Sequence, residues 1–64
     1  MSEAVELASE FARVRIEPNY EANGPRLKVL DLESGRERFL DPMELATLTL
    51  VSHRDLDPFL RSAR

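Results

Sequence analysis

The chain has 64 residues and no cysteine, and this combination limits its fold more than any other feature. A chain of this length buries only about 60% of the surface that its unfolded form exposes, so its stability is marginal. Small domains usually gain stability from disulfides, metals or oligomerisation. The absence of cysteine excludes disulfides and thiolate metal sites, and one histidine does not supply a common zinc site. We therefore expect a single domain over residues 1–64, without a cofactor, stabilised by packing within the chain or against a partner.

Residues 1–9 lack the features of a targeting segment. They are acidic where a signal peptide is basic, and the apolar stretches of the chain are far shorter than a membrane span. We expect a soluble, cytoplasmic protein with no membrane association, in which residues 1–9 are flexible or helical.

Three strands are predicted in the middle of the chain. Residues 11–17 alternate apolar and charged side chains, and Pro18 should end this strand because proline cannot donate to a ladder. After a turn containing Asn23 and Gly24, residues 26–32 form a second strand. Residues 36–40 form a third, after the Ser34–Gly35 turn. Short connections between sequential strands predict an antiparallel meander.

A helix is predicted directly after the third strand. Asp41 is a capping residue, Pro42 suits the first helical position, and Glu44 is spaced for a capping box, so a helix should run from about 42 to 52. The β-branched side chains from Thr47 onward weaken this prediction, and a fourth strand beginning there is the alternative.

The C-terminal segment repeats the Leu-Asp-Pro sequence of residues 40–42. It predicts a last short helical turn beginning near Asp57, with Leu56, Phe59 and Leu60 returning to the core. The expected fold class is α+β: a three-stranded antiparallel meander followed by a C-terminal helix and this final short helical turn.

The segment His53-Arg54-Asp55-Leu56 matches the start of a protein-kinase catalytic loop. In kinases an Asn five residues after the Asp binds a metal ion, whereas this chain has Leu60 there. No glycine-rich phosphate loop is present, and the chain is far too short for two kinase lobes. We interpret the match as chance and His53 as an exposed residue past the helix, near the C-terminal end of its dipole.

Several short segments resemble a group of short actinobacterial proteins that are often labelled dihydrodiol dehydrogenase. The matching pieces are Glu10-Phe11-Ala12, Val14-Arg15-Ile16, Asn23-Gly24, Arg26-Leu27, Gly35-Arg36, Leu40-Asp41-Pro42 and Glu44 through Leu48-Thr49. The resemblance spans about residues 9–50. The chain departs from the group at Leu50, where the relatives carry Trp.

The label of this group implies nicotinamide-dependent oxidation of an aromatic dihydrodiol, but the residues for that chemistry are missing. Such enzymes use a G-x-G-x-x-G turn and a Tyr with a Lys four residues later. Here Gly24 stands four residues after Tyr20, and the only lysine is Lys28. The resemblance therefore implies association with an oxygenase or dehydrogenase system of aromatic or alicyclic catabolism, and we expect no enzymatic activity.

Basic residues concentrate in the predicted sheet, although the net charge is −3. Those expected to bind a larger protein partner are Arg13, Arg15, Arg26 and Lys28 on one sheet face, with Arg36 and Arg38. Like charges on neighbouring strands repel, and an acidic partner surface would relieve this repulsion. In the alternative interpretation the face is only solvated, with its arginines paired to Glu17, Glu33 and Glu37.

Three other functions stay open at this point. The basic face could bind nucleic acid with help from Phe11 and Tyr20, although overall acidity argues against it. Pairing of exposed sheet edges could produce a homodimer. His53 and Asp55 could complete the site of a partner enzyme.

Overall fold

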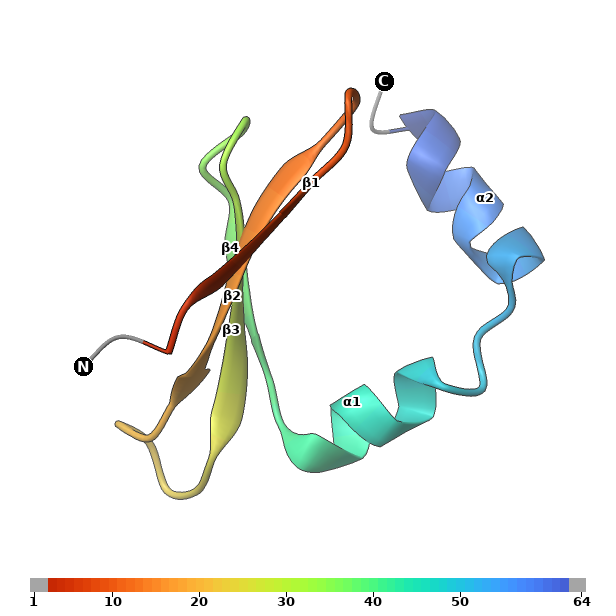
Figure 1. Cartoon of the computed structure of the whole chain (residues 1–64). Coiled ribbons are helices and arrows are strands. Elements are labelled where there is room, and N and C mark those ends of the chain that lie inside the picture. The colour runs from red at the N-terminus through yellow and green to blue at the C-terminus, as the bar shows by residue number, and fades with distance from the viewer. Residues whose placement is uncertain (1–2, 63–64) are drawn as a thin grey trace.

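The computed structural model describes residues 3–62 and has the predicted α+β architecture. Its elements are β1 (Val5–Ala8), β2 (Arg13–Asn19), β3 (Arg26–Asp31), β4 (Glu37–Leu40), α1 (Pro42–Leu48) and α2 (His53–Ser62). The strands form one antiparallel sheet in the order β1-β2-β3-β4, so each strand pairs with its neighbour in sequence. Figure 1 shows this meander on one side and the two helices on the other.

The prediction of three strands is wrong, because residues 5–8 form a fourth. Val5 and Leu7 lie opposite Ile16 and Val14, and Glu6 lies opposite Arg15. The alternation of apolar and acidic residues therefore matches that of β2, so the pairing aligns apolar with apolar and acid with base. The expectation of a flexible or helical segment fails for residues 5–8, and residues 1–2 lie outside the described part of the chain.

Strand β2 begins and ends two residues later than predicted, and Pro18 lies inside it. Strand β1 pairs with β2 only as far as Ile16. Beyond that point β2 is an edge strand on this side, where a residue without an N–H is tolerated. Pro18 therefore lies opposite Leu27 without interrupting the pairing with β3.

The turn between β3 and β4 is held by one carboxylate. Asp31 accepts hydrogen bonds from the Ser34 hydroxyl at 2.7 Å and from the Glu33 N–H at 3.0 Å. These bonds, chiefly the one from Ser34, hold the pKa of Asp31 below its usual value. Gly35 completes the turn with φ of +80°, a conformation that other residues rarely adopt.

Helix α1 begins as predicted and ends earlier. Asp41 accepts a hydrogen bond from the Glu44 N–H at 2.7 Å, and Glu44 accepts one from the Asp41 N–H at 3.0 Å, which completes the capping box. The helix stops at Leu48, not near residue 52, and Thr49 is its C-cap. The Thr49 hydroxyl bonds the Ala46 carbonyl, the local competition that makes threonine a weak helix former. The alternative strand near Thr47 does not form.

We expect Asp41→Ala to lower the free energy of unfolding by about 1 kcal/mol, because loss of an N-cap side chain leaves helix N–H groups without an acceptor. Urea denaturation followed by circular dichroism measures the change. Asp57→Ala is the control, since the Asp57 carboxylate makes no hydrogen bond within residues 3–62. Equal losses in the two variants would contradict the role of the cap.

Helix α2 is a ten-residue helix, so the prediction of a final short turn starting near Asp57 is wrong. It begins at His53 because Ser52 and Asp55 cap it reciprocally. Asp55 accepts from the Ser52 N–H at 2.9 Å, and the Ser52 hydroxyl accepts from the Asp55 N–H at 3.2 Å. The kinase-like letters are thus a helix start, and His53 lies at the N-terminal end of a helix dipole rather than near a C-terminal end. Pro58 lies inside the helix, where it removes one backbone hydrogen bond.

The cap of α2 should make its stability depend on pH. Hydrogen bonds from the Ser52 backbone and hydroxyl lower the pKa of Asp55 from its ordinary 3.8. A carboxylate with a lowered folded pKa stabilises the fold above its unfolded pKa, and this stabilisation disappears as the pH falls through the folded pKa. We therefore expect the NMR signals of residues 53–62 to report fraying only below pH 3.8. Asp55→Asn keeps an acceptor but cannot titrate, so unchanged acid fraying in this variant would contradict the assignment.

The helices and the sheet form an open arch (Figure 1). α1 contacts β4, which precedes it directly, while α2 has no comparable contact with any strand. Among the described residues no side chain is fully buried. The Cα radius of gyration is 12.9 Å, whereas a compact domain of this length has about 11 Å. The predicted core therefore does not close within one chain.

Candidate functional site

The strand register sorts the sheet side chains into two faces. Val5 lies opposite Ile16, and Ile16 lies opposite Val29, so these three residues share one face. We call it the apolar face, and its apolar members are Val5, Leu7, Val14, Ile16, Pro18, Leu27, Val29 and Leu40. Among the paired strand residues it carries only two charges, Arg38 opposite Val29 and Asp31 at the end of β3.

Helix α1 covers one end of the apolar face. Leu45 is half-buried, and it lines a depression of about 200 Å³ together with Pro18 and Leu27 of the sheet. At the other edge of the sheet, Val5 and Leu7 are 51% and 56% exposed. Most of the apolar face therefore has no helix packed on it.

Helix α2 has an apolar stripe that is equally uncovered. Leu56, Phe59 and Leu60 follow the spacing of one helix side, and they are 42%, 72% and 55% exposed. The expectation that they return to the core is wrong. The linker of residues 49–52 separates α2 from α1, and α2 stands apart from the strands (Figure 1). Leu60 lines a depression together with Phe11 and Ala12 of the connection between β1 and β2.

The two uncovered regions lie on the same side of the sheet, because α1 packs near Pro18 and Leu27 of the apolar face and α2 continues on that side (Figure 1). We call their sum the apolar surface. It consists of the apolar face with Leu45, Leu48, Leu56, Phe59 and Leu60. Sequence reasoning assigned most of these residues to the core and missed Val5 and Leu7, although their alternation with Glu6 was the available signal.

The opposite side of the sheet, which we call the charged face, brings together Arg13, Arg15, Arg26 and Lys28. The other two basic residues named from the sequence lie elsewhere. Arg38 is on the apolar face. Arg36 precedes β4, where its Nε donates to the Ser34 hydroxyl at 3.1 Å.

No two basic residues of the charged face lie directly opposite one another in the ladders of residues 3–62, so the expected like-charge pairs are absent. Instead, Arg15 pairs with Glu6 at 3.2 Å, and Lys28 lies 3.8 Å from Glu17 and 3.5 Å from Glu37. These are exposed or half-exposed pairs, each worth under about 1 kcal/mol. They neutralise much of the positive charge that the sequence suggested for this face.

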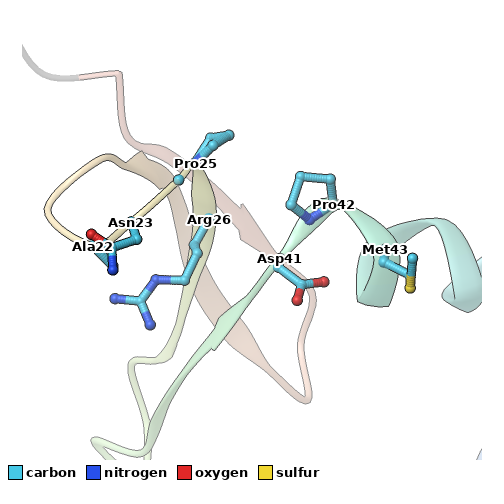
Figure 2. Close-up of a pocket in the computed structure, with 8 residues that line it drawn as sticks. Ala22, Asn23, Pro25, Arg26, Asp41, Pro42 and Met43 are labelled. Atoms are coloured by element: carbon cyan, nitrogen blue, oxygen red, sulfur yellow. The ribbon is translucent and has the colours of Figure 1, made fainter.

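A third feature is the depression of about 460 Å³ between residues 22–26 and the start of α1 (Figure 2). The Arg26 guanidinium lies 4.5 Å from the centre of the Phe39 ring, and its Nε is buried without a hydrogen-bond partner. The carboxylate nearby, Asp41, is already engaged in capping α1. The depression is open to solvent and has neither a nucleophile nor a histidine, so its lining offers little chemistry.

The other side chains that could take part in chemistry do not form a common site. Asp55 uses its carboxylate to cap α2, and no hydrogen bond joins it to His53 in the described part of the chain. Residues 3–62 contain no group of three or more His, Asp or Glu side chains that could hold a metal ion.

No helix within residues 3–62 has the length and apolar character needed to cross a membrane. Comparisons with protein-family models, curated proteins and solved structures find no match to the chain.

Proposed function

We propose that this protein is a small, non-catalytic interaction module that binds another polypeptide through the apolar surface. One observation carries the proposal. The apolar surface contains six large exposed apolar side chains, while no residue in the described range is buried; the six are Val5, Leu7, Leu48, Leu56, Phe59 and Leu60. Soluble monomers rarely expose extended apolar patches, and such patches usually mark an interaction site.

The energetics support a docked state. Covering apolar surface stabilises by about 25 cal/mol per Å², and the chain has not gained this stabilisation by folding alone. The edge of β1 and the stripe of α2 are the most exposed parts of the apolar surface. A partner that covers the apolar surface would therefore bind and complete the fold at once.

Two observations support a non-catalytic role. The carboxylates with the clearest local structure, Asp31, Asp41 and Asp55, are acceptors in a turn and two helix caps. In the depression lined by Asp31 and Ser34, the Ser34 hydroxyl donates to Asp31 at 2.7 Å and so holds an exposed turn. Within residues 3–62, neither of the two depressions near these carboxylates is lined by a histidine or lysine that could act as a general base.

For the partner, the resemblance to the actinobacterial group supports an oxygenase or dehydrogenase component of aromatic or alicyclic catabolism. We propose that the module acts in the cytoplasm as an accessory of such a system. The reaction itself would then belong to the larger protein.

Affinity capture from the native host tests the proposed function. We expect Leu7→Glu to reduce capture of a specific partner at least tenfold, because the carboxylate would be desolvated in an apolar interface. Ala8→Glu is the matched control, since it adds the same charge one residue later on the charged face. Equal capture by the wild type and both variants would contradict docking through the apolar surface.

Nucleic-acid binding is the second candidate function. It is favoured by the four basic residues of the charged face and by the ring of Phe39, which lies beside Arg26. The ion pairs of Arg15 and Lys28 weaken it, because a phosphate would have to displace carboxylates. A gel shift at low salt with single-stranded DNA tests it, and a wild type that does not bind, or that binds no better than Arg13→Glu/Arg15→Glu, would exclude it.

A further inference from the structure

We propose that the apolar surface is occupied by a second copy of this chain, with α2 of each copy packed on the apolar face of the other. The inference rests on the proposed function, because it names the occupant of the same surface. It differs from edge-to-edge strand pairing, since the contact joins faces and helices rather than the unpaired edges of β1 and β4.

The accessible surface of the chain is the first argument. It measures 5676 Å², whereas a compact monomer of 7.3 kDa exposes about 4,200 Å². The chain therefore exposes an excess of about 1,500 Å² over a compact monomer of the same mass. We assign this excess to the open arch, because the apolar face and α2 leave each other uncovered.

The size of this excess favours a second copy. Two chains that each cover it would bury about 3,000 Å² in total, which lies in the range of obligate homodimers. A standard interface between independently stable proteins buries only about 800 Å² on each side. Covering the apolar surface with such a contact would leave about half of the excess exposed.

Complementarity is the second argument. A sheet face and an amphipathic helix normally cover each other in a two-layer domain. This chain has both layers, an apolar sheet face and the stripe of Leu56, Phe59 and Leu60, but they do not pack together within one copy. In a two-fold dimer each layer meets its counterpart on the other chain, and the contact is made twice.

The distribution of charge agrees with this arrangement. The apolar face contributes one arginine, Arg38, and the carboxylate of Asp31 at its end, so burying its centre desolvates little charge. The charged face, with its ion pairs, stays in solvent on the outside of both copies. In a cell that also contains a larger partner, that partner and the second copy would compete for the apolar surface.

Sedimentation equilibrium of the full chain gives the first test. We expect twice the chain mass of 7.3 kDa throughout the micromolar range, and a monomer when Phe59 and Leu60 are both replaced by Asp. A wild type that is monomeric throughout that range would overturn the inference, whether or not α2 packs on the sheet of its own chain. If that monomer still captured a host partner, and if Leu7→Glu but not Ala8→Glu reduced the capture, the proposed function would stand and only the second copy would be excluded.

Cysteine cross-linking gives the second test, and the natural chain has no cysteine to interfere. Leu7→Cys and Phe59→Cys are prepared as separate proteins and mixed, so any disulfide between the two sites joins different chains. We expect the yield of this disulfide to be at least ten times that of the control pair, Ala8→Cys with Phe59→Cys, in which one thiol lies on the charged face. Equal cross-linking of the two pairs would overturn the proposed packing even for a dimeric protein.

Discussion

Diluting the purified protein a hundredfold should lower its thermal midpoint by about 10 °C. Unfolding of a dimer that has no stable folded monomer also separates the chains, so dilution favours the unfolded state. A hundredfold dilution changes the free energy of that process by about 2.7 kcal/mol per mole of dimer. Two chains of 64 residues gain about 0.27 kcal/mol/K of entropy on unfolding, which converts this free energy into the expected shift.

Circular dichroism melting at two concentrations measures this shift. The Phe59→Asp/Leu60→Asp variant is the control, because a chain that cannot associate and has no stable folded monomer should show no cooperative melting at either concentration. A wild-type midpoint that is equal at both concentrations would mean that the fold is complete within one chain.

The parts of the fold that depend on local patterns could be predicted from the sequence. Alternation in β2 places Val14 and Ile16 on one face and Arg13 and Arg15 on the other, which the register bears out. The start of α1 is likewise local, because Asp41 and Glu44 bond only to each other's backbone. Such features need no knowledge of the rest of the chain.

The missed elements depend on partners that a local pattern does not contain. Strand β1 has only four residues, and Val5 and Leu7 become a strand because β2 offers matching neighbours at Ile16 and Val14. Helix α2 was placed too late because Pro58 looked like a helix start. In the observed cap, Asp55 belongs to the segment that resembles a kinase catalytic loop, and Ser52 directly precedes that segment.

The candidate site could be predicted only in part for a related reason. Alternation in the strands groups apolar side chains on one face of the sheet, and the sequence predicts that Leu56, Phe59 and Leu60 return to the core. Whether a helix docks on its own sheet depends on the linker between the helices, and residues 49–52 keep α2 apart from the strands. Hydrophobic patterning identifies surfaces that must be covered, but it does not say which chain covers them.

Replacing Ile16 by Asp should remove more than half of the free energy of unfolding, since Ile16 lies on a central strand of the apolar face between Val5 and Val29. A carboxylate that is desolvated there without a partner costs about 3 kcal/mol or more, and small domains have only about 5 kcal/mol of total stability.

Leu30→Asp is the matched control for Ile16→Asp. Both residues are half-buried on central strands, but Leu30 lies on the charged face between Arg15 and Glu37. The control should therefore lose only about 1 kcal/mol, because the new carboxylate stays partly hydrated and its attraction to Arg15 offsets its repulsion from Glu37. Urea denaturation of the two variants at equal concentration compares them. Similar losses would mean that both faces of the sheet meet water in the folded protein, and docking on the apolar face would then have no energetic basis.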